Sequence, residues 1–410
     1  MNVAARILQP SVKVTGIAGI LIGLLAFWLA LPPALVRTPV IPVILGIVAV
    51  AAGISVVTRG HLRLGYGAVV AGVLGIVLGL LAIQSGETHL RMVFTWGGLL
   101  AATLSYATPL TFAALGGMFS ERSGVVNIAL EGMMLVGAFF AVWGADVTGN
   151  WMLGLLIGMG MGGLFALIHA IWAIHFRADQ IVGGTAINFL ALGVTGYFFI
   201  QIYGNDGTPD LTSGSWFTGE SIPNVNIPGL GRDSFFGQVI GGLNLMIWLS
   251  IVALIVSYVV LFRTAIGLRI RAVGEHPRAA DTVGIDVYKT RYAAVIVSGM
   301  LAAMGGAYLS IGFVHSFNQN MTEGRGFIAL AALIFGKWRP FGAFAAALLF
   351  GFSSALAQQI PPAYSDSSLS VLSSSSLFLI LPYVLTLIAV AGVIGRSVAP
   401  AADGRPYVKQ

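Results

Sequence analysis

Polar side chains inside otherwise apolar stretches are the first candidates for chemistry in this sequence. Asn127 and Glu131 are four residues apart in a stretch expected to be helical, so they would share one helix face. Glu131 lies seven residues beyond Gly124, which is about 10 Å into a helix that starts there. A charge at that depth in a membrane costs at least about 2.5–3.5 kcal/mol. Glu131 is therefore expected either to face a polar path or to tie two helices together by a hydrogen bond.

A second polar group opens the apolar stretch at 180–202. Asp179 and Gln180 are expected at the boundary of the membrane, whereas Thr185 and Asn188 lie deeper and share a helix face. Their hydroxyl and amide groups suit a hydrogen bond either to a neighbouring helix or to a polar solute. The candidates for a solute path are thus Asn127, Glu131, Thr185 and Asn188.

A third candidate of a different kind is the segment 274–285. A proline near its start and a glycine just past its end predict a short, bounded helix. Ala279, Ala280 and Val283 would give this helix a small apolar face that fits a groove in a partner protein. The alternative is a solvated linker helix. The residues expected to take part in docking are Gly274, Glu275, His276, Pro277, Ala279, Ala280, Val283 and Gly284.

Several kinds of chemistry have no support in the sequence. Without cysteine there is no disulfide, thiolate metal site or cysteine nucleophile, and the six histidines show no metal-ligand spacing. No Gly-x-x-x-x-Gly-Lys-Ser/Thr loop occurs, so we expect no ATP bound in the P-loop manner and no cofactor in this chain. The formal net charge is +6, but the basic residues form no continuous patch, so nucleic acid is not an expected partner.

The composition indicates which elements must position these residues. Of 410 residues, 57% are hydrophobic and 9% charged, with a mean hydropathy of +0.91, whereas a soluble domain is about 25% charged. We therefore expect an all-α polytopic membrane protein with about 11–12 transmembrane or re-entrant helices. The stretch at 326–336 is too short to span the bilayer and would be broken or re-entrant. The apolar stretches are 14–31, 40–57, 64–83, 93–116, 124–143, 152–174, 180–202, 243–262, 292–313, 326–336, 340–357 and 376–395.

The distribution of Lys and Arg predicts the orientation of these helices. With the N-terminus in the cytoplasm, 17 of the 21 Lys and Arg residues fall on the inside. Cytoplasmic loops are enriched in Lys and Arg, so both termini are expected in the cytoplasm. The loop 203–242 would then be external and the basic loop 263–291 cytoplasmic. The four basic residues placed outside are Arg37, Arg91, Arg232 and Arg325.

Two parts of the chain resemble each other. Residues 116–137 and 312–336 each contain a glycine, a polar turn and a second glycine that opens an apolar run. The charge distribution places the two turns on opposite sides of the membrane. Inverted repeats of this kind occur in transporters, where the solute path lies between the repeats.

Four stretches resemble the permease subunits of ABC importers that serve simple sugars, branched-chain amino acids and nucleosides. The variant Asn-Ile-Ala-Leu-Glu-Gly at 127–132 is similar to the nucleoside branch, the basic membrane protein type. The resemblance covers residues 90–395 and implies a type II importer-like permease. The four stretches are ERSGVVNIALEGMMLVGAFFAVW (121–143), ADQIVGGTAINFLALGVTGYF (178–198), RTAIGLRIRAVGEHPRAADTVGI (263–285) and GFIALAALIFGKWRPFGAFAAALLFG (326–351).

This resemblance implies a subunit of an ATP-driven nucleoside importer in the cell membrane, which gives alternating access to solute. Implied partners are a sister permease in a heterodimer, a cytoplasmic ABC ATPase that carries ATP and Mg²⁺, and an external substrate-binding lipoprotein. It also implies that the helix within 274–285 transmits closure of the ATPase to the membrane. The expected division is an N-terminal extension of about three helices at 1–88, a permease core at 89–398 and a cytoplasmic tail at 399–410.

Other functions stay open from the sequence alone. Within the same class, the solute would be a simple sugar or a branched-chain amino acid. A different class is an ion-coupled secondary transporter, which would need no ATPase. A membrane-embedded enzyme is a third class, and no paired catalytic groups support it.

Overall fold

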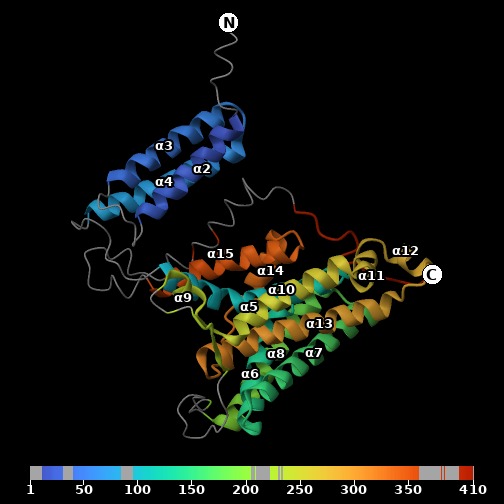
Figure 1. Ribbon diagram of the computed structural model, residues 1–410. Helices are drawn as coiled ribbons and strands as arrows, with labels where there is room; N and C mark the ends of the chain where they lie inside the picture. The colour runs from blue at the N-terminus through green and yellow to red at the C-terminus, as the bar shows by residue number, and fades with distance from the viewer. Residues whose placement is uncertain are drawn as a thin grey trace. The chain divides into compact units, whose positions relative to one another are not determined.

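The computed structural model describes most of the chain as helices (Figure 1). Among the described residues, eight helices are long and apolar enough to cross a membrane, which confirms an all-α polytopic membrane protein. The chain divides into two compact units, residues 1–100 with 353–396 and residues 101–352 with 397–410. The residues described are 12–30, 40–84, 96–204, 208, 222–229, 231, 234–359, 380, 383 and 397–409.

The first unit contains a bundle of three helices, α2 (Val12–Ala30), α3 (Val40–Thr58) and α4 (Leu62–Gln84). Small residues line their contacts. A methyl group on Gly53 of α3 would come within 2.7 Å of the carbonyl oxygen of Gly65 on α4. Backbones that approach this closely pack well in lipid, where van der Waals contact rather than the hydrophobic effect joins helices.

The second unit holds all the candidate residues. Its long helices include two that end in a π-helical turn, η1 and η2, and a small antiparallel β-hairpin accompanies α9. The elements are α5 (Trp96–Arg122, from residue 101 onward), α6 (Leu130–Thr148), α7 (Trp151–Ala170), η1 (Ile171–His175), α8 (Gln180–Tyr203), β1 (Asn224–Asn226), α9 (Phe235–Ile240), β2 (Gly242–Asn244), α10 (Leu245–Arg263), α11 (Ala265–Glu275), α12 (Pro277–Thr282), α13 (Val287–Ala307), η2 (Tyr308–Val314), α14 (Arg325–Phe335) and α15 (Pro340–Gln359, to residue 352).

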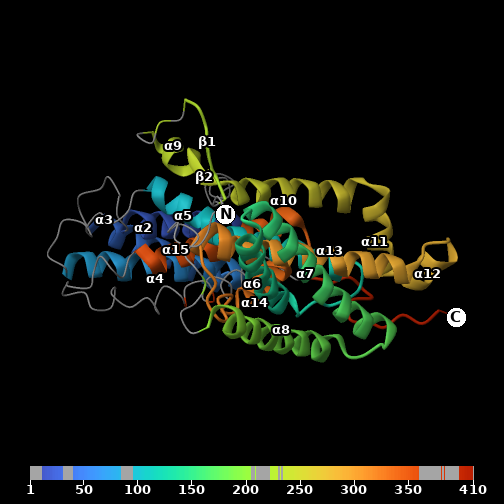
Figure 2. The ribbon, with the colours of Figure 1, turned by 90° about the horizontal axis from the view of Figure 1, so that it is seen from below.

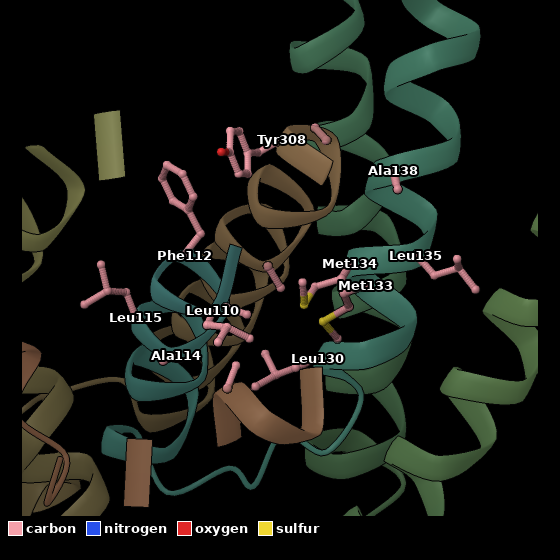
Figure 3. Close-up of a cluster of buried hydrophobic side chains, with 14 of the residues drawn as sticks. Leu110, Phe112, Ala114, Leu115, Leu130, Met133, Met134, Leu135, Ala138 and Tyr308 are labelled. Atoms are coloured by element: carbon pink, nitrogen blue, oxygen red, sulfur yellow. The ribbon is translucent and has the colours of Figure 1, made fainter. Parts of the chain in front are cut away.

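Helix α6 forms the centre of this unit and is buried along almost its whole length. It packs on α7 and α13 through small residues, and a Cβ on Gly137 would collide with Ala303 of α13. Figure 3 shows apolar side chains from α5, α6 and η2, among them Leu110, Met134 and Tyr308, gathered in the space between these helices. The core is therefore built around the helix that follows Asn127.

Helix α6 begins later than the sequence indicates. The expected helix at 124–143 starts only at Leu130, and residues 123–129 form a non-helical linker that we call the α5–α6 linker. Gly124 adopts a left-handed conformation with φ of +88°, which interrupts the helix. The expectation that Asn127 and Glu131 share a helix face is therefore wrong.

Eleven of the twelve apolar stretches contain a described helix. The last stretch, 376–395, falls almost wholly outside the described residues. Helix α14 is 11 residues long, too short to span a bilayer, as its sequence indicates. The turned view in Figure 2 shows α11, α12 and the C-terminus together at one end of the second unit, which we call the α12 end.

Candidate translocation and docking sites

Glu131 joins the N-termini of two helices. It lies in the first turn of α6, and its carboxylate accepts hydrogen bonds from the N-terminus of α14. Oε1 accepts from the N–H of Gly324 at 2.8 Å, and Oε2 accepts from the N–H of Gly326 at 2.6 Å. The side chain is 8% exposed. Glu131 therefore ties the two helices together, which is the second of its two expected roles.

The physical reason for this position is electrostatic. The first N–H groups of a helix have no partner within the helix, and they carry a partial positive charge. The N-termini of α6 and α14 meet, and the carboxylate of Glu131 lies where both partial charges favour an anion. Gly326 is required beside it, because a Cβ there would collide with the backbone of Glu131.

Asn127 holds the α5–α6 linker to α13. The side chain is fully buried, and its Nδ2 donates to Oγ of Ser298 at 2.8 Å. Its Oδ1 accepts from the N–H of Ala129 at 3.1 Å, next to the start of α6. The amide oxygen and nitrogen thus both bond to the chain itself.

Asn188 and Thr185 of α8 have different surroundings. Oδ1 of Asn188 accepts from the N–H of Gly132 at 2.8 Å, and its Nδ2 donates to the carbonyl of Ile128 at 3.1 Å. Thr185 is exposed, and its hydroxyl donates to the carbonyl of Ile181 in its own helix at 2.9 Å. The structure therefore gathers Asn127, Glu131 and Asn188 at the N-terminus of α6 and leaves Thr185 apart.

Two further residues that hold the linker were not singled out as candidates from the sequence. Oε1 of Gln180 accepts from the N–H of Val126 at 2.8 Å, and Nε2 of His169 lies 3.1 Å from the carbonyl oxygen of Val126. Both side chains are buried. The signal available was a polar residue at the edge of an apolar stretch, and for Gln180 that position predicted only a place at the membrane boundary.

The segment 274–285 contains the expected short helix, but it is not one helix throughout. Gly274 and Glu275 end α11, His276 separates the two helices, and Pro277 opens α12. Gly284 follows α12 with a left-handed φ of +86°. The proline and glycine boundaries are thus confirmed.

The predicted apolar face of this segment is divided between two sides. Ala280 is 3% exposed and packs with Val273 and Val287 inside the second unit. Ala279 is exposed, and Val283 is 75% exposed. The expectation that all three residues form one docking face is therefore wrong, because only Ala280 of the three faces inward.

Charged side chains near the α12 end form a buried cluster that sequence reasoning missed. Oε2 of Glu121 accepts from Nε1 of Trp338 at 2.6 Å, and Arg122 donates through Nη2 to the carbonyl of Trp338 at 2.8 Å. Arg291, 1% exposed, donates through Nε to the carbonyl of Ser123 at 3.1 Å. The cluster connects the end of α5 with the turn after α14 and with α13.

Asp403, near the C-terminus, is the neighbouring acid of this cluster. Burial raises the pKa of its carboxyl to about 7, although the N–H of Gly404 and the charge of Arg291 partly offset that effect. The carboxyl group is therefore near its midpoint of titration at neutral pH.

A groove of about 690 Å³ lies elsewhere in the unit, between α10 and α13. Its walls are almost entirely apolar, and Arg269 and Lys289 stand at one end. None of the four candidates for the solute path lines this groove.

Residues 99–396 match the family described as the permease component of branched-chain amino acid transport systems. The chain belongs to this family. This permease is 45% identical to the guanosine ABC transporter permease protein NupQ of Bacillus subtilis over 323 residues, which cover 76% of this chain and 96% of NupQ. It is 41% identical to the nucleoside ABC transporter permease protein NupC of Lactococcus lactis, over 78% of this chain and 99% of NupC.

A more distant relative of this permease is the guanosine ABC transporter permease protein NupP, also of Bacillus subtilis. The two are 26% identical over 69% of this chain and 80% of NupP. No solved structure matches this permease.

The match to the family leaves both ends of this permease outside it. Helices α2, α3 and α4 precede residue 99, and the described segment 397–409 follows residue 396. The polar residues at the N-terminus of α6 and the segment 274–285 lie within the match, whereas the C-terminal residues that surround Arg291 do not.

Proposed function

We propose that this permease is one of two membrane-spanning subunits of an ATP-driven ABC importer for nucleosides in the cell membrane. The observation that carries this proposal is the likeness to NupQ and NupC, which are named as guanosine and nucleoside permeases and match this chain over nearly their whole length. A simple sugar or a branched-chain amino acid is the competing substrate class within the same family.

The other permease of the complex would be a related but different chain. NupP and NupQ are both named as guanosine permeases of one organism, and this chain is much more similar to NupQ. The exposed side of α8 also favours a second membrane subunit. Phe189 and Tyr197 are 69% and 61% exposed there, and Thr185 lies on the same helix. A solute path between the two permeases would then include Thr185 and the N-terminus of α6.

The energy would come from a separate cytoplasmic ATPase, which holds ATP and Mg²⁺. The distribution of Lys and Arg supports cytoplasmic termini and a cytoplasmic α12 end, where the ATPase would dock. The exposed side of α12, with Ala279 and Val283, is the surface available to it. We expect no cofactor and no metal in the permease itself.

Solute would be delivered from the opposite side by a binding lipoprotein. The β-hairpin and α9 belong to the loop expected outside the cell. Phe235 and Phe236 of α9 are exposed, and aromatic side chains are common anchors for a protein partner.

The contacts of α11 support a route from the ATPase to the membrane helices. Gly274 lies so close to Arg122 that a Cβ on Gly274 would collide with the Arg122 carbonyl. Movement of α11 and α12 would therefore reach the α5–α6 linker directly. That linker leads to Glu131 and hence to α14. A movement of the linker would therefore reach both of the similar segments, 116–137 and 312–336.

Uptake by the reconstituted complex tests this function. The permease, its sister permease, the ATPase and the binding lipoprotein are assembled in proteoliposomes with ATP inside or outside. We expect uptake of labelled guanosine that requires ATP and the binding protein and that unlabelled nucleosides, but not ribose or leucine, inhibit. Inhibition by ribose or leucine alone would assign the competing substrate class.

The same preparation separates the importer from a secondary transporter. Uptake by the importer is unaffected by a protonophore as long as ATP is supplied. Uptake that proceeds without the ATPase and collapses with a protonophore would reject the ABC importer.

A further inference from the structure

The C-terminal segment 397–409 has no role in the function described so far, yet it is closely attached to the rest of the permease. Oγ of Ser397 donates to the carbonyl of Ile334 at the end of α14 at 2.9 Å. Further along, the N–H of Ala402 donates to the carbonyl of Gly274 at the end of α11 at 2.9 Å. Figures 1 and 2 both show the C-terminus beside α12.

The end of the segment packs against the inner side of α12. Tyr407 is 6% exposed and forms a small apolar cluster with Val273, Ala280 and Val287. Its ring centroid lies 5.6 Å from that of Tyr288. Tyr407 therefore covers the side of α12 that is turned away from the exposed Val283.

The middle of the segment is joined to the α5–α6 linker through Arg291. This guanidinium donates through Nη1 to the carbonyl of Arg405 at 3.1 Å, as well as through Nε to the carbonyl of Ser123 at 3.1 Å. One buried side chain of α13 thus holds both the linker and the tail. A Cβ on Gly404 would be in ordinary contact with Val126 of the same linker, at 3.4 Å.

We propose that segment 397–409 is a strap that fixes α11 and α12 to the α5–α6 linker, with Tyr407 and Arg291 as positioning residues for energy coupling. The inference rests on the proposed ABC importer function. A helix of six residues has almost no stability by itself, because the first turn costs more than its hydrogen bonds return. Packing against Tyr407 supplies the missing support while leaving Ala279 and Val283 free for a partner.

A rigid attachment is what coupling requires. If α12 moved independently of the linker, displacement by the ATPase would be absorbed at the His276 junction between α11 and α12. The strap makes α11, α12 and the α5–α6 linker move together as one rigid unit. A second consequence is that removal of the strap exposes Ala280, which the strap covers.

The first experiment tests the attachment without any transport. The natural chain has no cysteine, so Ala280→Cys and the exposed control Ala279→Cys each give a single thiol. Both are made in the full chain and in a chain that stops before Arg405. A membrane-impermeant maleimide is then applied to inside-out vesicles that hold the membrane subunits without the ATPase, which would otherwise cover position 279.

The expected result is a thiol at 280 that reacts at least about tenfold faster in the shortened chain, because a buried thiol reacts only when its cover opens. The thiol at 279 should react equally fast in both. An unchanged rate at position 280 would overturn the strap.

The second experiment measures coupling, as nucleoside imported per ATP hydrolysed. Tyr407→Ala removes the packing side chain, Tyr407→Phe retains the ring, and Val408→Ala changes the exposed neighbour. We expect the ratio to fall at least about fivefold for Tyr407→Ala and for the shortened chain, while the amount of ATPase recovered with the permease is maintained. The Phe and Val408 variants should remain within about twofold of the natural chain.

The readouts distinguish the strap from a general structural role and from failure of the proposed function. A merely structural tail would lower assembly and ATPase recovery together and leave the ratio unchanged in what remains. A normal ratio in Tyr407→Ala with position 280 exposed would overturn the coupling role. Absence of ATP-dependent uptake in the natural complex would reject the importer, yet the labelling result would still report on the attachment.

Discussion

The N-terminus of α6 and the α12 end differ in how far their candidate residues are available to a partner. At α6, the side chains of Asn127, Glu131 and Asn188 are all bonded to backbone or side-chain groups of the same chain. At α12, neighbouring residues alternate between a buried inner side at Ala280 and an exposed outer side at Val283. In an apolar bundle an unpaired polar group is costly, so polar residues become part of the structure. At the water boundary, exposure costs little and residues remain available to partners.

The largest expected effect lies at Glu131. Replacing it with alanine leaves the N–H groups of Gly324 and Gly326 without an acceptor, and each unsatisfied buried donor costs about 1–3 kcal/mol. We expect Glu131→Ala to lower the stability of the complex by roughly 2–6 kcal/mol, seen as a lower melting temperature of the purified complex. Thr185→Ala is the matched control and should remain within about 0.5 kcal/mol.

Glu131→Gln sharpens the same comparison. The amide retains one acceptor oxygen but loses the charge between the two helix N-termini, so the loss of stability should be smaller than for alanine. A Glu131 variant with an unchanged melting temperature and abolished uptake would contradict the structural role and favour a solute path.

The two sides of α12 are distinguished by the same substitution at different positions. Ala280→Glu places an unpaired charge in the cluster with Tyr407, and such a charge costs about 3–5 kcal/mol when left without a partner. We expect this variant to loosen the α12 end of the permease itself. Val283→Glu should leave the permease unchanged in melting temperature and reduce the recovery of the ATPase.

Recovery of the ATPase is measured by affinity purification through the permease. Equal losses of permease stability in the two variants would show that α12 has no free outer side, and the division between its two sides would be wrong.

The two glycines at the start of α14 offer a smaller and more local test. A Cβ on Gly326 would collide with Glu131, whereas a Cβ on Gly324 meets nothing within 4 Å. Overpacking costs about 1–3 kcal/mol, so Gly326→Ala should destabilise the complex by that amount. Gly324 has a φ of +82°, which strains any other residue. Gly324→Ala should therefore lower the stability of the complex by only about 1–2 kcal/mol. Thermal melting of the two variants side by side checks the order, and the reverse order would place the close contact at Gly324.

The smallest expected effect is a dependence on pH at the tail. Burial raises the pKa of Asp403 to about 7, so the folded tail binds this proton more tightly than the unfolded chain does. The contribution to stability is therefore complete below the unfolded pKa and is lost as pH rises through about 7. Two titratable groups face Asp403, namely Arg291 on α13, whose charge favours the charged form of Asp403, and Glu121 on α5.

The measurement is the rate of maleimide labelling at Ala280→Cys relative to Ala279→Cys. We expect this ratio to rise from about pH 6 to 8 in the natural background and to rise less with Asp403→Asn, which removes the carboxyl group of the tail. An equal rise in both backgrounds would remove Asp403 as the cause.

Much of the fold follows from local patterns in the sequence. Long apolar stretches predicted the positions of the long described helices, because about 20 such residues are needed to cross lipid. The bounds of α12 followed from Pro277 and Gly284, whose backbone preferences are nearly independent of tertiary context. The domain division at residues 88 and 398, the orientation and the roles of the path residues stay predictions.

What the tertiary structure alone decided is which partner each side chain has. The sequence predicts Asn127 and Glu131 on one helix. The left-handed turn at Gly124 interrupts the helix before Asn127, and the Asn127 amide bonds to Ser298 on α13 instead. It likewise could not indicate that Tyr407 lies on Ala280, more than a hundred residues away. Periodicity and composition record the preferences of neighbours along the chain. Long-range packing depends on how whole helices approach each other, so only the folded chain shows which faces meet.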